Sequence, residues 1–276
     1  MVRNRIRQIV SLIGGSKHSL GQHFLCREDV VARMVEAAKI SPNDSVLEIG
    51  PGLGILTREL VFSPAKEVIA CEKDERFFEY LRGSLKNKKL KLINQDALIL
   101  IPNLVAASPL KVISNLPYNI SSPVIISLLT VCPVLPKTLV LMIQKEVAQR
   151  LTAKPDDSNR GILTVLLDMM GRCKIIEKIP QSYFYPEPEV ESAVILVDNI
   201  TPLPYLAKDA FRIIKMAFAQ KRKKIKNTLF STLKIEPARC VEIAKLSKIS
   251  LDQRPEELTR EQWLKLIEIV LLELPK

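Results

Sequence analysis

Residues 45–60, SVLEIGPGLGILTREL, decide the fold that we expect for this chain of 276 residues. The run SVLEI is short and apolar, which is typical of a buried strand. Glycines follow at positions 50, 52 and 54, and residues 55–61, ILTRELV, have the apolar spacing of a helix. A strand that passes through a glycine-rich turn into a helix predicts the start of a βαβ unit.

The same alternation continues on both sides of this stretch. Predicted strands 45–49, 67–72, 90–94, 110–116 and 137–143 alternate with predicted helices 28–39, 55–61, 74–86, 123–131 and 144–153. Two more strand-like runs, residues 173–179 and 192–197, flank a proline-rich loop. This rhythm predicts an α/β fold with a doubly wound, mostly parallel, Rossmann-like sheet.

The pattern changes after Asp198. Two prolines interrupt residues 199–209, and only helical segments follow, at 209–220, 223–233, 237–247 and 259–274. We therefore predict an α/β domain over residues 20–200 and a small all-α domain over residues 201–276. Residues 1–19 are basic and predict a flexible arm, with a mitochondrial transit peptide as the alternative interpretation.

The composition limits the kinds of binding partner and the cellular compartment that we expect for this chain. Basic residues outnumber acidic ones by 41 to 30, a net charge of +11, which favours polyanionic partners but also fits a merely soluble basic protein. The five cysteines include no CxxC pair, so neither a metal site nor a disulfide framework is indicated. We expect a reducing, cytoplasmic location, and no apolar run reaches transmembrane length.

The glycine spacing and two carboxylates predict a cofactor site. From Glu48 onward the spacing fits ExGxGxG, whereas a dinucleotide fingerprint would need a glycine where Ile55 stands. Glu72 ends the second strand, where a carboxylate can accept both hydroxyls of a ribose. Asp96 follows the third strand, where it can accept from an adenine amino group. An ordinary turn with polar strand ends is the alternative, but the combination favours S-adenosylmethionine (SAM).

The fourth strand ends in Asn115-Leu116-Pro117-Tyr118, similar to the [D/N]PP[Y/F] signatures of enzymes that methylate amino groups of bases. Asn115 and Leu116 each offer a carbonyl to the amino group, and Pro117 adds no competing donor. Tyr118 offers a face on which an unstacked base can lie. No general base is obvious, so positioning and electrostatics would carry the reaction. A plain Pro-Tyr turn is the alternative.

Together these motifs resemble the small-subunit ribosomal RNA adenine dimethyltransferases, the bacterial family that confers kasugamycin sensitivity. The matching segments are SLGQHFL, LEIGPGLG, ACEKD, NQDAL, NLPYNISSP, LMIQKEVAQRL, SYFYPEPEVESAV and FAQKRKKIKNTL. The resemblance implies methyl transfer from SAM to N6 of two adjacent adenosines in the loop of the 3′-terminal hairpin of small-subunit (16S) rRNA. It implies N6,N6-dimethyladenosine as the product and the maturing small subunit as the partner, and we expect a monomer.

The resemblance also assigns roles to residues. The implied cofactor-binding residues are Gln22, His23, Leu25, Gly50, Gly52, Glu72, Asp96, Ala97 and Asn115. The implied catalytic residues are Asn115, Leu116, Pro117, Tyr118 and Phe184. Family members often have Asn where His23 stands. Phe184 would cover the adenine from the side opposite Tyr118, although it could equally be a core aromatic, with Tyr183 or Tyr185 in its place.

A basic run begins the predicted helical domain. It consists of Lys221, Arg222, Lys223, Lys224 and Lys226, and a second basic patch near the N-terminus contains Arg5, Arg7 and Lys17. Such a run is usually a solvated face. We expect both patches to contact rRNA phosphates, which predicts binding that weakens steeply with salt.

Two other functions compete with this one. A large-subunit rRNA adenine methyltransferase of the macrolide-resistance type shares the glycine loop and a related Asn-x-Pro-Tyr segment, but NLPYNIS and FAQKRKKIKN favour the small-subunit type. The second is a non-enzymatic role, as a ribosome-assembly checkpoint or a mitochondrial transcription factor. The intact glycine loop, Glu72, Asp96 and Asn115 favour retained catalysis.

Overall fold

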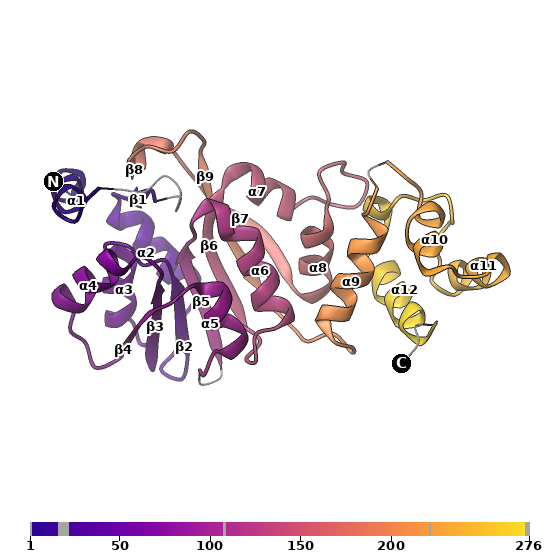
Figure 1. Cartoon of the computed structure of the whole chain (residues 1–276), viewed down its shortest axis with the longest axis horizontal. Coiled ribbons are helices and arrows are strands. Elements are labelled where there is room, and N and C mark those ends of the chain that lie inside the picture. Colours follow the sequence, from indigo (N-terminus) through magenta and orange to yellow (C-terminus); the bar gives the residue numbers. More distant parts are fainter. Residues whose placement is uncertain (1, 16–21, 107–108, 221, 274–276) are drawn as a thin grey trace. The chain divides into compact units, whose positions relative to one another are not determined.

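The computed structural model describes residues 2–15, 22–106, 109–220 and 222–273, and the larger of its two sheets has seven strands. These strands are labelled in Figure 1. The strand order is β4-β3-β2-β5-β6-β9-β7. The strands are β2 (Ser45–Ile49), β3 (Glu67–Glu72), β4 (Leu90–Asn94), β5 (Leu110–Asn115), β6 (Thr138–Gln144), β7 (Arg172–Ile179) and β9 (Ser192–Asp198). Strands β2 to β6 pair in parallel and β9 runs antiparallel to β6, which confirms the predicted mostly parallel sheet.

Strand β2 lies where the order of the strands in the sheet reverses. Ile49 of β2 is opposite Cys71 of β3 on one side, and Leu47 is opposite Val112 of β5 on the other. From β2 the chain builds outward to β4 and then returns to add β5 on the opposite side. Open parallel sheets hold their ligands at such a reversal, beyond the carboxyl ends of the strands.

Helices connect the parallel strands. They are α2 (Glu28–Ala37), α3 (Ile55–Phe62), α4 (Glu75–Ser84), α5 (Ala97–Leu100), α6 (Ser121–Thr130) and α7 (Lys145–Leu151). Two of them begin at a carboxylate cap, because Asp74 accepts from the Arg76 N–H at 3.2 Å and Asp96 from the Leu98 N–H at 2.9 Å. These caps satisfy donors that the first turn of a helix leaves open.

A two-stranded sheet joins segments that are far apart in the sequence. Strand β1 (Phe24–Leu25) pairs antiparallel with β8 (Phe184–Tyr185), with Phe24 opposite Tyr185 and Leu25 opposite Phe184. The pairing brings the predicted N-terminal motif next to the proline-rich loop that precedes β9.

The prediction of a flexible arm over residues 1–19 is wrong for the part of it that forms α1 (Val2–Leu12). Ile6 and Val10 of this helix are buried in a cluster that includes Phe24 and Phe77. The Arg76 guanidinium donates to the carbonyls of residues 13, 14 and 15 at 3.1–3.2 Å, and these bonds hold the segment that follows the helix. Residues 16–19 lie outside the described residues.

The chain divides into two compact units, residues 1–148 with 174–200 and residues 149–173 with 201–276. The helices of the second unit are α8 (Ile162–Met170), α9 (Ala207–Ala217), α10 (Leu229–Leu233), α11 (Pro237–Leu246) and α12 (Arg260–Glu273). Residues 149–173 therefore depart from the predicted domain of residues 20–200. Contacts of α8 explain this, because Arg260 of α12 donates to the carbonyls of Asp168 and Met169. Within the described residues, no helix meets the length and apolar character that spanning a membrane requires.

Candidate active site

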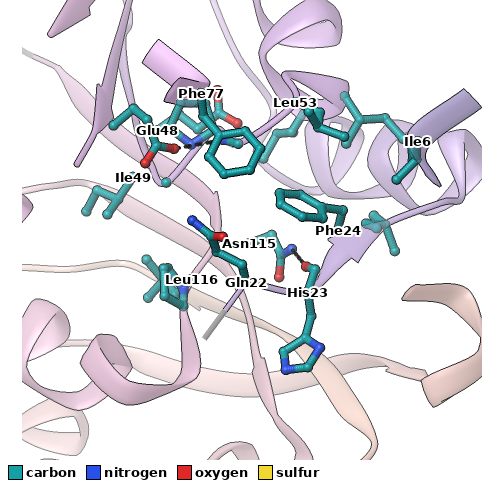
Figure 2. Close-up of a pocket in the computed structure, with 18 of the residues that line it drawn as sticks. Ile6, Gln22, His23, Phe24, Glu48, Ile49, Leu53, Phe77, Asn115 and Leu116 are labelled. Carbon is teal, nitrogen blue, oxygen red and sulfur yellow. Dashed lines mark hydrogen bonds between the residues drawn. The ribbon is translucent and has the colours of Figure 1, made fainter. Parts of the chain in front are cut away.

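A cavity of about 790 Å³ lies at the carboxyl ends of the central strands (Figure 2). Its size suits a cofactor or a small ligand. Its lining includes every residue predicted to bind the cofactor, namely Gln22, His23, Leu25, Gly50, Gly52, Glu72, Asp96, Ala97 and Asn115. Leu116, Pro117 and Tyr118 line the same cavity. The fold thus brings together residues from five separate stretches of the sequence.

The glycine loop gives the cavity a wall made of backbone. Gly50 and Gly54 have φ values of +68° and +78°, in the left-handed region that favours glycine. A Cβ on Gly50 would approach the Pro117 ring to 3.2 Å, and a Cβ on Gly54 would clash with the Leu81 side chain. The first of these contacts packs the glycine loop directly against the segment predicted to bind the base.

Glu72 holds the glycine loop in place. One carboxylate oxygen accepts from the Gly52 N–H at 3.0 Å, and the other accepts from the Asp74 N–H at 2.8 Å. The residue is 7% exposed, and this burial raises its pKa. Because each carboxylate oxygen has two acceptor positions, Glu72 can accept ligand hydroxyls while it keeps both backbone bonds.

Asp96 lies at the end of β4 and caps α5. One oxygen accepts from the Leu98 N–H, and the other forms an ion pair with Lys73 at 2.8 Å. The Lys73 ammonium lowers the pKa of Asp96, so that the carboxylate is charged near neutral pH. Lys73 also lines the cavity, and the sequence analysis did not identify it.

Glu48 is a second carboxylate that the sequence analysis did not place in the site. It lines the cavity, is 2% exposed, and its Oε2 has no hydrogen-bond partner among the described residues. Burial raises its pKa to about 8, which keeps it mostly protonated near neutral pH. Its place in the ExGxGxG spacing is the signal that could have identified it.

Asn115 and Tyr118 are held by contacts with other segments. The Asn115 amide nitrogen donates to the His23 carbonyl at 3.5 Å, which leaves its side-chain oxygen as an acceptor. The Leu116 N–H donates to the Met142 carbonyl at 3.1 Å, and this bond holds the end of β5 against β6. The Tyr118 hydroxyl lies 2.6 Å from Ser192 Oγ, and burial raises the tyrosine pKa. The phenol is therefore neutral and fixed at its polar end.

Phe184 does not occupy the position predicted for it. Its side chain is fully buried in the hydrophobic core with Leu25 and Met34, and it is not among the residues that line the cavity. Pairing of β1 with β8 explains this, because it puts Phe184 opposite the buried Leu25. The prediction that Phe184 presents an open face to a base is wrong for this structure. Tyr183 and Tyr185 do not line the cavity either.

Helix α1 supplies part of the cavity wall that the sequence analysis missed. Its residues on the lining include Val2, Ile6 and Ile9, and Figure 2 shows Ile6 near Phe24 and Leu53. The signal was present in the spacing of Ile6, Ile9, Val10 and Ile13, which marks one apolar helical face. An apolar face of this kind packs against other apolar residues and does not stay mobile in water.

The basic run of the second unit is not the continuous helix predicted for residues 223–233. A short 3₁₀ turn, Ile225–Asn227, precedes α10, because the Ile225 N–H donates to the Gln253 carbonyl at 2.8 Å. Lys224 and Lys226 both form ion pairs with Asp252, at 3.0 and 2.7 Å. Arg222 and Lys223 are exposed, and Lys221 lies outside the described residues.

Comparisons with known proteins agree with this geometry. The model of the family described as "Ribosomal RNA adenine dimethylase" matches residues 15–271. A "Ribosomal RNA small subunit methyltransferase A" from Synechococcus sp. (strain CC9311) is 36% identical over 261 residues, covering 91% of this chain and 94% of the relative. A protein of the same name from Dehalococcoides mccartyi is 34% identical, covering 91% of this chain and 87% of the relative.

Two solved structures are similar over most of their length. A dimethyladenosine transferase from Plasmodium falciparum is 26% identical with a TM-score of 0.77, covering 91% of this chain and 98% of that one. The 23S rRNA methyltransferase ErmE is 27% identical with a TM-score of 0.66, covering 89% of this chain and 98% of that one. With a family match over nearly its whole length, the chain belongs to the ribosomal RNA adenine dimethylase family.

Proposed function

We propose that this chain transfers methyl groups from SAM to N6 of two adjacent adenosines in the loop of the 3′-terminal hairpin of small-subunit rRNA. The product is N6,N6-dimethyladenosine. The observation that carries the proposal is the single cavity that holds the glycine loop, Glu72, Asp96 and the Asn115–Tyr118 segment. Relatives named for the small subunit, at 34–36% identity, favour this target over the 23S rRNA named for ErmE, at 27%.

The residues at the strand ends fit SAM. Gly50 and Gly52 line the cavity, where a ligand would lie against their backbone. Glu72 would accept the ribose hydroxyls, and Asp96 would accept from the adenine amino group. Lys73 would have to share Asp96 with that amino group. When bound, the cofactor supplies a methyl group attached to a cationic sulfur. This methyl group is electrophilic without further activation.

The base would be handled by the segment that follows β5. The Asn115 side-chain oxygen and the Leu116 carbonyl would accept from the target amino group, which directs its lone pair toward the methyl donor. Tyr118, fixed by Ser192, would carry the extruded base on its ring face. The proton released from the amino group would pass to solvent. In this scheme the protein contributes positioning and electrostatics.

The basic run of the second unit would contact rRNA phosphates. Arg222 and Lys223 would do so directly, while Lys224 and Lys226 would exchange Asp252 for phosphate. Removing the charges of Arg222 and Lys223 should lower the slope of log affinity against log salt by about one per cation. A function in small-subunit maturation, as a cytoplasmic monomer, completes the proposal.

The test is methyl transfer from labelled SAM to undermethylated small subunits. We expect Asn115→Ala to lower kcat/KM by about 100-fold or more, the loss seen when one preorganised transition-state contact is removed. Asn103→Ala is the matched control, because Asn103 is exposed and its amide donates to the carbonyl of Ile99. Equal rates for wild type and Asn115→Ala would contradict the mechanism. Methylation of large-subunit rRNA, mapped by primer extension, would contradict the target.

A further inference from the structure

Burial of Phe184 leaves Tyr118 with a different aromatic neighbour. The imidazole of His23 lies on the Tyr118 ring, with centroids 5.5 Å apart and planes inclined by 23°. Both residues line the cavity. Figure 2 shows this imidazole on the far side of Asn115 from Glu48 and Phe77. The pair therefore belongs to the end of the cavity that would receive a base.

Each ring is held at its polar edge, so that the two faces stay aligned. His23 Nδ1 lies 2.9 Å from the Pro186 carbonyl oxygen, and since a carbonyl only accepts, Nδ1 carries the proton. The Tyr118 hydroxyl is bonded to Ser192. The backbone carbonyl of His23 also accepts from the Asn115 amide, so the stack adjoins the acceptor group of the proposed reaction.

We propose that His23 is a second stacking wall for the target adenine, which inserts between the imidazole and the Tyr118 ring. The inference rests on the proposed function. A base between two rings needs about 7 Å, or two stacking intervals of about 3.4 Å each. The rings must therefore separate by about 1.5 Å from their 5.5 Å spacing, which a small rotation of the partly exposed His23 side chain provides.

The exchange of stacks favours the base. Entry of adenine replaces one ring–ring stack by two base–ring stacks, and each base–ring stack is sequence-tolerant because it uses the face of the base. His23 thus does the task that Phe184 cannot do from the core. The alternative is that the imidazole only blocks the empty site and leaves when the base arrives, which makes the opposite prediction for its removal.

Two substitutions test the imidazole ring and its hydrogen bond to Pro186 separately. His23→Asn keeps a donor near the position of Nδ1 and removes the ring, whereas His23→Phe keeps a ring and removes the donor. With undermethylated small subunits and saturating SAM, we expect His23→Asn to lower kcat/KM by roughly three- to tenfold, the loss of about one base–ring stack net of the stack already present. His23→Phe should lose less activity than His23→Asn does, because it keeps a ring that can stack.

A fluorescence measurement reads the stack itself. A hairpin RNA with 2-aminopurine in place of the target adenosine should be quenched when bound to wild type or His23→Phe, and brighter when bound to His23→Asn or Tyr118→Ala. The inference is overturned if His23→Asn is more active than wild type, or if it is equally active and quenches 2-aminopurine to the same extent. Either result leaves the proposed function intact. An inactive wild type overturns both.

Discussion

The two ends of the cavity are built from different kinds of contact. At the cofactor end, the positions are set by backbone: glycines with positive φ, and Glu72 bonded to two main-chain N–H groups. At the base end, they are set by side chains: Tyr118 on Ser192, and the His23 ring on Tyr118. Backbone geometry follows from strand ends and glycine spacing, whereas ring positions depend on how distant segments pack. The two ends should therefore respond differently to substitution.

The largest expected effect is on cofactor affinity. Glu72→Ala removes the proposed acceptor of the ribose and leaves the Gly52 and Asp74 N–H groups without their partner, so we expect the Kd for SAM to rise about 100-fold. Titration calorimetry measures it. Affinity for small subunits should be nearly unchanged, and an equal loss of both affinities would show that the two ends are not separable.

Glu67→Ala is the matched control for this substitution. Glu67 begins the same strand and pairs with Ser45 and Lys91 at the end away from the cavity. Its removal should leave the Kd for SAM within about twofold of wild type, because Glu67 is not among the residues that line the cavity.

The next effect is on stability at the cofactor end. Gly54→Ala puts a side chain at φ +78° and against Leu81, so the free energy of unfolding should fall by about 2–3 kcal/mol. Urea denaturation measures the change. Gly83→Ala, inside α4 and with open space around it, is the control and should instead raise stability by about 0.5–1 kcal/mol. Equal effects of the two substitutions would remove the argument for backbone strain.

Sequence reasoning succeeded where backbone determines the site. Glu72, Asp96 and Asn115 could be placed because the carboxyl ends of parallel strands meet at one edge, and the glycines could be placed because their spacing follows the turn. His23 and Phe184 could not be placed in the same way. The contact of His23 with Pro186 spans 163 residues and depends on β1 pairing with β8, two strands of two residues each. No local pattern predicts such short strands.

A third effect is on the pH dependence of stability. Glu48 has its pKa raised from 4.5 to about 8 by burial, so the folded state holds this proton more strongly than the unfolded state does. Glu48 therefore lowers the free energy of unfolding as the pH rises from 4.5 to about 8. Glu48→Gln removes this contribution, which amounts to at most about 1.4 kcal/mol per pH unit. Urea denaturation at several pH values should give a flatter curve for the variant, and identical slopes would mean that Glu48 is ionised when folded.

The smallest expected effect is at the base end, where a side-chain contact fixes the position of the Tyr118 ring. Tyr118→Phe keeps the ring and removes the 2.6 Å contact with Ser192, so kcat/KM for small subunits should fall about threefold to fivefold, near the value of one hydrogen bond. Cofactor affinity should not change. Ser192→Ala should give a similar loss, because it removes the other half of the same contact. If the contact acts by orienting the ring, the double variant should be no worse than either single one. Fully additive losses would mean that the two hydroxyls act separately. The contact between Tyr118 and Ser192 would then not be what orients the tyrosine ring.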